Sequence, residues 1–366
     1  MDYNNDKRTV MTLDAGGTNF VFSAIQGGKE VIEPISLPSN ASNLNKCLET
    51  LVVGFEKVKA ALPEKPVAIS FAFPGPADYP NGIIGDLGNL PSFRGGIALG
   101  PMLEEKFNLP VFINNDGDLY AYGEALAGYL PFINQLLEEA GSPKRFKNLV
   151  GFTLGTGFGA GIVRNGELFI GDNSGAGEVW LLRNKLNPEM NAEEGVSIRA
   201  VQREYANQVG ISFEDAPTPK DIFEIASGKL DGNKEAALNA YKRMGEVLGD
   251  AIGNVLTLID GIAVIGGGVS GAASLFLPAM MEEINSNYKN YNGDVYRRLA
   301  VSAFNLEDEK DLELFKKGDS KEITVPGSSK KIMYDPMSRV GVGISKIGTS
   351  KAVALGAYAF ALNNLK

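Results

Sequence analysis

Histidine is absent from the 366 residues of this chain, and cysteine and tryptophan each occur once. Without histidine, an imidazole general base, a Ser/His nucleophile pair and the Cys/His classes of zinc site are all excluded. The single cysteine, Cys47, excludes an internal disulfide. Because Cys47 falls on the apolar face of an expected helix, we interpret it as an inert core thiol rather than a reactive one. Acid–base chemistry must therefore use carboxylates, lysine or tyrosine.

Basic charge and long apolar runs are also scarce. The chain has 35 Lys and Arg against 44 Asp and Glu, a net charge of −9, so we expect neither a nucleic-acid partner nor binding to an anionic membrane. The most apolar stretch, residues 255–269, is interrupted by Asp260 and by glycines and is too short to span a bilayer. The first eight residues lack the apolar segment of a secretory signal. These features predict a cytoplasmic protein.

Two glycine-rich turns are the most informative motifs. The first, residues 13–19, reads Leu-Asp-Ala-Gly-Gly-Thr-Asn, and the second, residues 154–161, reads Leu-Gly-Thr-Gly-Phe-Gly-Ala-Gly. Each lies between two segments typical of strands, which are residues 9–13 and 20–25 for the first turn and 149–153 and 159–163 for the second. Glycine lets main-chain amides approach an anion closely, as phosphate oxygens require. Two such turns facing each other would hold a nucleoside triphosphate between two halves of the protein.

A third strand follows each turn in the same way. Gly27-Gly28 precedes residues 30–35, and Asn165-Gly166 precedes residues 167–170; such dipeptides between strands are strong hairpin signals. The same three-stranded unit therefore occurs twice, and the length of the chain also favours two domains. A cleft between two domains is the expected ligand site.

Apolar periodicity places the remaining elements. We expect helices over residues 44–62, 99–107, 117–129, 196–208, 219–227, 233–258, 275–285 and 350–363, and strands over 67–73, 111–113 and 261–265. Residues 286–338 are rich in Asn, Lys, Asp and Tyr and are interpreted as a surface insertion with one hairpin, formed by 322–325 and 331–334. A lid, a dimer contact and an inert insertion all stay open as roles for this segment.

Four motifs occur in the order found in the actin-like sugar kinases: residues 14–19, Asn115-Asp116, residues 154–161 and residues 265–268. The sequence most resembles the ROK family of bacterial sugar kinases and sugar-responsive repressors, over nearly the whole chain except about residues 130–147 and 286–338. This resemblance implies an α/β fold with two actin-like (ribonuclease H-like) domains and an interdomain cleft. We assign residues 1–114 and about 350–366 to a small N-terminal domain, and residues 115–349, including the insertion, to a large C-terminal domain.

The resemblance also implies the nucleotide site, with ATP and Mg²⁺ as cofactors. Asp14 would hold Mg²⁺ through water, since Mg²⁺ takes one or two carboxylates and keeps most of its waters. The ATP phosphates would face Gly16, Gly17, Thr18 and Asn19 of the first turn and Gly155, Thr156 and Gly157 of the second. The adenosine would lie against Gly266, Gly267 and Gly268. The alternatives are a turn aspartate that caps its own backbone and, for the last glycines, a tight strand-to-helix corner.

Asp116 is the candidate general base. A sugar hydroxyl that attacks the γ-phosphoryl group must lose its proton, and an aspartate accepts it in other kinases. Asp116 lies where a helix begins, and a helix N-terminus favours the ionised carboxylate. Asn115 can donate and accept hydrogen bonds to sugar hydroxyls. The alternative is an aspartate that only caps its helix.

The remaining sugar contacts follow from the resemblance. Gly75 lies in a Pro-Gly loop, Asn89 in an Asn-Leu-Pro segment, and Glu178 and Glu193 match two glutamates of the family, with Glu194 as the alternative to Glu193. The sequence departs from the family where Leu181 replaces a histidine and Trp180 replaces a glycine, and the usual cysteine-rich zinc loop is missing, so no zinc site is expected. Trp180 could offer a stacking face to a sugar or could be a core residue, and both interpretations stay open.

The sequence therefore predicts a glucokinase-like enzyme that uses ATP to phosphorylate a sugar hydroxyl. The expected substrate is a hexose or an N-acetylhexosamine. The resemblance also implies a homodimer. The alternative is a non-catalytic, sugar-binding regulatory protein. A repressor is disfavoured, because 13 residues before Asp14 leave no room for a helix-turn-helix module.

Overall fold

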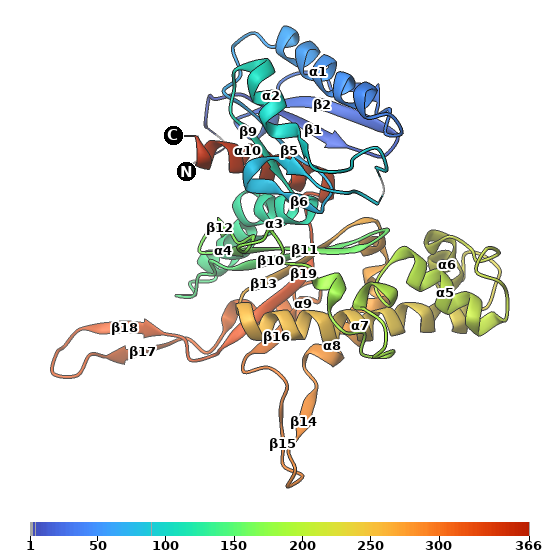
Figure 1. The fold of residues 1–366 in the computed structure, drawn as a ribbon. Coiled ribbons are helices and arrows are strands. Elements are labelled where there is room, and N and C mark those ends of the chain that lie inside the picture. Colours follow the sequence, from blue (N-terminus) through green and yellow to red (C-terminus); the bar gives the residue numbers. More distant parts are fainter. Residues whose placement is uncertain (1–2, 4, 89, 366) are drawn as a thin grey trace. The chain divides into compact units, whose positions relative to one another are not determined.

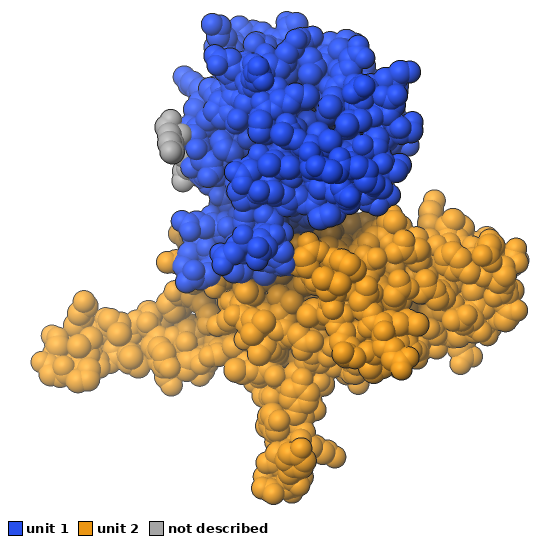
Figure 2. Space-filling model, viewed as in Figure 1, with its two compact units in different colours: residues 1–128, 161–177, 347–366 blue, residues 129–160, 178–346 orange. Residues whose placement is uncertain are grey.

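The computed structural model describes residues 3, 5–88 and 90–365, which form two compact units. Unit 1 comprises residues 1–128, 161–177 and 347–366, and unit 2 comprises residues 129–160 and 178–346 (Figure 2). Each unit contains a sheet with helices packed on it (Figure 1). Our assignment of residues 1–114 and about 350–366 to one domain, and of residues 115–349 to another, stays a prediction.

Unit 1 is built on a six-stranded sheet of order β3-β2-β1-β5-β9, with β4 paired to β2. Strands β1, β5 and β9 are parallel, and β2 is antiparallel to β1. The sheet strands are β1 (Val10–Ala15), β2 (Asn19–Gln26), β3 (Lys29–Glu30), β4 (Ile35–Pro38), β5 (Ala68–Ala72) and β9 (Val111–Asn114). The other elements are α1 (Leu44–Ala61), β6 (Ala77–Asp78), the 3-10 turn η1 (Tyr79–Asn81), β7 (Ile83–Ile84), β8 (Ile97–Ala98), α2 (Leu99–Phe107), α3 (Asp116–Leu126) and α10 (Thr349–Asn364).

Both faces of the unit 1 sheet are buried, which explains its continuous apolar strands. Side chains alternate along β1, so Met11 belongs to the core beneath α1 and α2 while Val10 packs with Tyr358 of α10. Cys47 of α1 is fully buried in the first of these cores. Burial raises the pKa of its thiol to about 11. The predicted core position is confirmed, and the low reactivity of the thiol stays a prediction.

Helices α3 and α10 approach each other closely because both carry glycine at the contact. A Cβ at Gly123 would lie 1.9 Å from the carbonyl oxygen of Ala352, and one at Gly356 would lie 1.9 Å from that of Leu119. No other residue type fits such an approach without displacing a backbone. The C-terminal helix predicted over residues 350–363 therefore packs closely against α3.

Unit 2 contains most of a second six-stranded sheet, of order β12-β11-β10-β13-β19-β16, in which β10, β13, β19 and β16 run parallel. The sheet strands are β10 (Leu149–Leu154), β11 (Phe158–Arg164), β12 (Glu167–Leu168), β13 (Ile262–Gly266), β16 (Ser302–Asn305) and β19 (Arg339–Ile344). The helices are α4 (Tyr129–Glu139), α5 (Ile198–Val209), α6 (Pro219–Ala226), α7 (Lys234–Ile259), α8 (Ala273–Ile284) and α9 (Glu309–Lys317), with the 3-10 turns η2 (Val179–Leu181), η3 (Ala192–Glu194) and η4 (Gly268–Ala272).

The long helix α7 packs along α8 through two glycines. Gly245 and Gly249 would each place a Cβ within 2.5 Å of a carbonyl oxygen of α8, so glycine is required at both positions. In the ranges that the structure describes, no helix is long and apolar enough to cross a membrane.

Two hairpins project from unit 2 (Figures 1 and 2). The first pairs β14 (Asn287–Lys289) with β15 (Val295–Arg297), and the second pairs β17 (Lys321–Thr324) with β18 (Lys331–Tyr334). The second is the hairpin predicted from the sequence. The first was not predicted, and neither were α9 and the sheet strands β16 and β19, so the stretch 286–338 carries a strand of the main sheet as well as projecting hairpins.

Two further predictions of secondary structure were wrong. The expected strand over 30–35 is interrupted after β3, since Pro34 has no N–H to donate to a neighbouring strand. The helix predicted to end near Tyr129 stops at Leu126, and a second helix, α4, begins at Tyr129. Pro131 concealed α4 in the sequence, but proline is tolerated in the first turn of a helix.

Candidate active site

The carboxyl ends of β1, β5 and β9 carry the chemically relevant residues of unit 1. These strands are parallel, with Val10 paired to Ala68 and Ala72 paired to Asn114. Asp14 lies near the end of β1, the Pro-Gly loop follows β5, and Asp116 follows β9. In α/β sheets this edge is where ligands usually bind. The fold thus brings the predicted base and the first phosphate turn to the same edge of one sheet.

The first turn, residues 16–18, connects β1 to β2 and is held by Ser39. The Ser39 hydroxyl donates to the Gly17 carbonyl oxygen over 2.7 Å, and its amide donates to the Thr18 carbonyl oxygen over 2.9 Å. A Cβ at Gly16 would lie 2.8 Å from the Asn19 carbonyl oxygen, whereas a Cβ at Gly17 would meet no atom within 4 Å. The packing therefore requires glycine at position 16 but not at 17, and the bare backbone of Gly17 fits close approach by a ligand.

Asp116 is the first residue of α3, which Asn115 caps. The Asn115 and Asp116 side-chain oxygens share the Gly117 amide, over 2.8 and 2.9 Å. The start of α3 packs tightly against β11, because a Cβ at Gly161 would lie 2.4 Å from the Gly117 carbonyl oxygen. The last glycine of the second motif is therefore fixed by packing against the helix of the candidate base.

The electrostatic surroundings raise the pKa of Asp116, contrary to the expectation that the helix N-terminus would favour the ionised carboxylate. Desolvation raises the pKa of Asp116 above its ordinary value of 3.8, and the negative charge of Asp14 adds to the increase. The backbone amides of Gly117 and of Asp116 itself act in the opposite direction. The Asp116 side chain still reaches solvent. A carboxylate that is accessible and holds its proton more tightly than usual suits a proton acceptor in catalysis.

The chemistry of this edge fits a magnesium ion bound with a nucleotide. Asp14 is exposed beside the turn, and its charge reaches Asp116. Mg²⁺ needs only one or two carboxylates when phosphate oxygens and waters complete its shell. Among the described residues, no group of three or more Asp, Glu, His or Cys side chains could hold a metal by itself. Asp14 would therefore bind a metal only together with phosphate.

The Pro-Gly loop is fixed by Tyr79. The Tyr79 hydroxyl donates to the Phe73 carbonyl oxygen over 2.9 Å and would lie 3.0 Å from a Cβ at Gly75. Gly75 itself is exposed. Asn89, the other predicted sugar ligand of unit 1, lies outside the described residues.

The second turn, residues 155–157, lies at the carboxyl edge of the unit 2 sheet and contacts Glu193. A Glu193 carboxylate oxygen accepts from the Phe158 amide over 3.0 Å and would lie 2.7 Å from a Cβ at Gly157. Arg199 pairs with Glu193 at 3.0 Å, whereas Glu194 pairs with Arg203 instead. Glu193 therefore contacts the second turn, and its predicted role toward the sugar stays a prediction.

The third glycine segment lies beside this second turn. A Cβ at Gly267 would lie 2.3 Å from the Leu154 carbonyl oxygen, and Gly267 has a φ of +92°, so both packing and backbone geometry require glycine. A Cβ at Gly268 would meet nothing within 4 Å, which is also true of Gly155. Gly266 ends β13, next to β10. The structure thus brings the two predicted nucleotide segments of unit 2 together at one sheet edge, each with an unobstructed glycine.

Glu178 and Trp180 lie on and beside the η2 turn, and both are exposed. The indole N–H of Trp180 donates to the Glu178 carboxylate. Trp180 is 36% exposed and Leu181 is 59% exposed. The interpretation of Trp180 as a core residue is therefore wrong, whereas a stacking role stays a prediction. The indole supplies Glu178 with a hydrogen-bond donor in a region that lacks histidine.

Ser39 and Arg199 were not predicted as parts of either turn. Ser39 reaches the first turn only because β4 pairs with β2, with Asn19 opposite Pro38. Arg199 reaches Glu193 because α5 begins at the second turn, where the Ile198 amide donates to the Gly155 carbonyl oxygen. The sequence does not show that these two residues contact the turns, because each comes from a segment that reaches its turn only in the folded structure.

Two α/β sheets, each with a glycine turn after its first long strand, define a protein of the actin-like (ribonuclease H-like) class. The chain belongs to the ROK family, whose model matches residues 10–309. Its sequence is 26% identical over 308 residues to glucokinase of Halalkalibacterium halodurans, over 76% of this chain and 86% of that protein. It is 26% identical over 269 residues to N-acetyl-D-glucosamine kinase of Vibrio cholerae, over 70% and 83% of the two chains. The crystal structure of glucokinase from Parabacteroides distasonis is 58% identical, covers 100% of both chains and has a TM-score of 0.92.

Proposed function

We propose that this protein is an ATP-dependent sugar kinase that transfers the γ-phosphoryl group to a hydroxyl of a hexose or an N-acetylhexosamine. The observation that carries the proposal is the single sheet edge that holds Asp14, the first phosphate turn and Asp116. Membership of the ROK family and the 58% identity to a glucokinase support the same reaction. Among hexoses, glucose is the first candidate substrate because of that identity.

In the proposed reaction, Asp116 accepts the proton of the attacking sugar hydroxyl, and Asn115 orients the sugar. The amides of residues 16–18 and 155–157 bind the phosphates, where main-chain donors stabilise the charge that develops during transfer. Asp14 would hold Mg²⁺, which shields the phosphate charge when bound. The glycines at 266–268 would lie against the adenosine.

The sugar side of the site is proposed to consist of Gly75, Asn89, Asn115, Glu178 and Glu193. Trp180 both orients Glu178 through its indole N–H and offers an aromatic face to the apolar side of a pyranose. Glu193 would contribute to sugar binding while it also braces the second phosphate turn. We also propose that the protein acts as a homodimer.

The experiment that tests this function is a screen of hexoses and N-acetylhexosamines, with and without Mg-ATP, by thermal shift and ADP release. A kinase gives sugar-dependent ADP release, with glucose or N-acetylglucosamine among the active sugars. A thermal shift with a sugar but no ADP release would contradict the kinase and support a sugar-binding regulatory protein. Omission of Mg²⁺ should abolish turnover while sugar binding is retained.

A further inference from the structure

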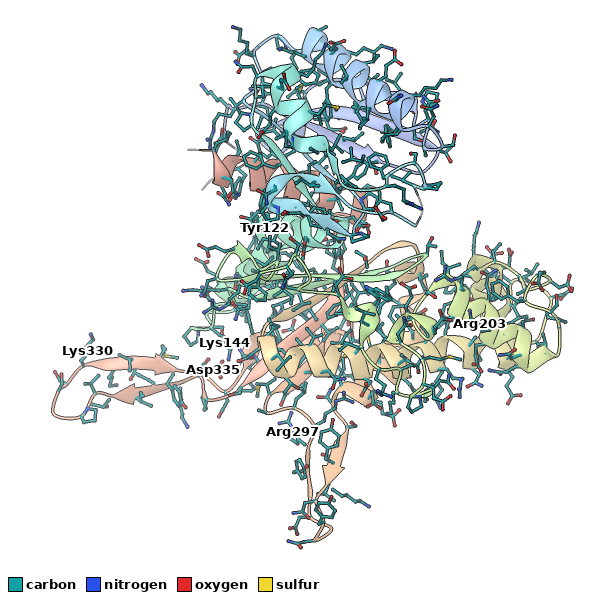
Figure 3. All side chains as sticks on the ribbon, viewed as in Figure 1. Tyr122, Lys144, Arg203, Arg297, Lys330 and Asp335 are labelled. Carbon is teal, nitrogen blue, oxygen red and sulfur yellow. The ribbon has the colours of Figure 1, made fainter. Side chains whose placement is uncertain are left out.

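Two hairpin arms project from unit 2 (Figures 1 and 2), and the site described above uses neither. We define the first arm as residues 287–297, which include β14 and β15, and the second arm as residues 321–334, which include β17 and β18. Arg297 marks the first arm in Figure 3, Lys330 lies on the second arm, and Asp335 lies at its base.

The arms collect a large share of the exposed apolar side chains of this protein. Of the twenty large hydrophobic side chains that are exposed in the described ranges, eight lie on the arms, which together contain only 25 residues. The eight are Tyr288, Tyr291, Val295, Tyr296, Ile323, Ile332, Met333 and Tyr334. Concentrated exposure of this kind marks an interaction surface, whereas scattered exposure does not.

Three of the four exposed large apolar side chains of the second arm lie on one face. Ile323 lies opposite Ile332, and Tyr334 lies on the same face because side chains alternate along a strand. The other face carries Met333 and the ion pair of Glu322 with Lys331, at 2.5 Å. The three apolar side chains are between 36% and 47% exposed. A hairpin whose large apolar side chains stay exposed in the described structure is suited to a partner.

The first arm presents tyrosines on a rigid tip. Tyr288 and Tyr296 face each other across the strands, with ring centroids 5.9 Å apart. Tyr291 lies at the turn and is 110% exposed. The Asn290 side chain organises this turn, since its oxygen accepts from the amides of Asn292 and Asp294 over 2.9 Å each. Tyrosines held in this way are typical anchors of protein interfaces.

Buried arginines fix the base of each arm. Arg298, with a side chain 3% exposed, pairs with Asp250 at 2.7 Å and with Glu283. Arg339, with a fully buried side chain, pairs with Asp335 at 2.6 Å and donates to the Phe315 carbonyl oxygen over 2.7 Å. These contacts fix the chain where each arm leaves unit 2, which reduces the conformational entropy that binding would cost.

The exposed area matches what a stable interface needs. At roughly 200 Å² for a fully exposed tyrosine, the four arm tyrosines, which are 45%, 110%, 52% and 47% exposed, offer about 500 Å² per chain. The four aliphatic side chains bring the total close to the ~800 Å² that each partner contributes to a standard interface. An isolated two-stranded hairpin is also only marginally stable in water, so each arm would gain stability from being covered.

The charge of the arms complements the rest of the chain. The arms carry the basic residues Lys289, Arg297, Lys321, Lys330 and Lys331 and the acidic residues Asp294 and Glu322. Their net charge is therefore +3, and the remainder of the chain has a net charge of −12 within the total of −9. Positive arms and an acidic body are complementary between two copies of the same protein.

We propose that the two arms are the surface through which this chain binds a second copy of itself, with the arms of each copy against the acidic body of the other. This inference names the surface of the homodimer proposed above and is independent of the kinase activity. Because each copy contributes the same elements, the arrangement can close with two-fold symmetry.

The test is sedimentation velocity of the full chain over a range of concentrations, at low and high salt. Three variants are compared: Tyr291→Ser with Tyr296→Ser on the first arm, Ile323→Ser with Ile332→Ser on the second, and Phe213→Ser as a control. Phe213 is 41% exposed and lies on neither arm. We expect the wild-type dimer to weaken with salt, and each arm variant to raise the dissociation constant at least about 30-fold, as expected for lost interface anchors.

The outcomes separate this inference from the homodimer itself. The control should dimerise like wild type, and all variants should keep the wild-type circular dichroism melt, since the altered side chains are exposed. Arm variants that dimerise like wild type would overturn the inference while leaving the homodimer intact. A wild-type protein that is monomeric at every concentration would overturn both. Hydrogen exchange provides a second measurement, in which the amides of both arms become protected as the dimer forms.

Discussion

The substitution Asp116→Asn should raise the stability of the fold while it abolishes turnover. Asparagine retains an oxygen that can accept the Gly117 amide hydrogen bond, so the start of α3 is preserved. It removes a carboxylate whose ionisation the folded protein disfavours through desolvation and through the charge of Asp14. The same carboxylate is the proposed proton acceptor, and loss of a general base lowers kcat by about 10²- to 10⁴-fold.

The sign of the stability change follows from the raised pKa of Asp116. Because the folded protein binds this proton more tightly than the unfolded chain does, stability falls as pH rises from 3.8 through the folded-state pKa, and the loss is complete above it. Because the side chain reaches solvent, we expect screening to limit the gain at neutral pH to about 1 kcal/mol.

A gain of this size should raise the melting temperature by about 2–4 °C for a domain of some 150–250 residues. Thermal and urea unfolding of wild type and Asp116→Asn, measured from neutral to acidic pH, provide the test. The difference should be present at neutral pH and vanish near pH 3.8, the ordinary value for aspartate. A variant that is less stable than wild type at neutral pH, or a difference that persists in acid, would refute the electrostatic reasoning.

Four further predictions concern other residues. Gly17→Ala should raise the free energy of unfolding by about 0.4–1 kcal/mol, because the added Cβ meets no atom within 4 Å. The same substitution should raise KM for ATP and leave KM for the sugar unchanged. An unaltered KM for ATP would contradict the proposal that this turn binds phosphate. Glu193→Gln should raise KM for the sugar without loss of fold in circular dichroism, and unchanged sugar kinetics would restrict Glu193 to bracing the turn. Arg298→Ala should lower the free energy of unfolding by about 3–5 kcal/mol, as expected for a broken buried pair, whereas the exposed control Arg297→Ala should change it by less than about 0.5 kcal/mol. Cys47, buried with a thiol pKa of about 11, should react with a thiol reagent only in denaturant, and fast labelling of the native protein would show that the core is open.

Much of the fold and the family could be predicted because the signals are local. Apolar periodicity predicted α2 as it stands, from Leu99 to Phe107, and α1 and α7 to within a residue or two. The two glycine turns and their order relative to Asn115-Asp116 indicated the ROK family, which the family model confirms. Local geometry also explains why Gly16 and Gly267 had to be glycine.

The features that were missed depend on contacts between distant segments. Strand β16 is four residues long and lies at the edge of its sheet beside β19, so nothing in its own sequence distinguishes it from a loop. Glu193 contacts the second turn because the η3 turn, in which it lies, folds back against that turn, and the sequence does not reveal this arrangement. The sequence showed only that residues 286–338, which contain the arms, have an unusual composition. The exposure of the arm tyrosines and the burial of the arginines at the arm bases are seen only in the structure.

In the proposed reaction, Asp116 activates a sugar hydroxyl toward the γ-phosphoryl group of ATP. The most direct measurement is single-turnover transfer of labelled γ-phosphate from Mg-ATP to glucose and to N-acetylglucosamine, with wild type and Asp116→Asn in parallel and sugar binding measured on the same samples. We expect labelled sugar phosphate with wild type. With Asp116→Asn we expect a rate lower by about 10²-fold or more, while the sugar still binds. Transfer at the wild-type rate by Asp116→Asn, or no labelled sugar phosphate with any hexose or N-acetylhexosamine, would contradict this proposal.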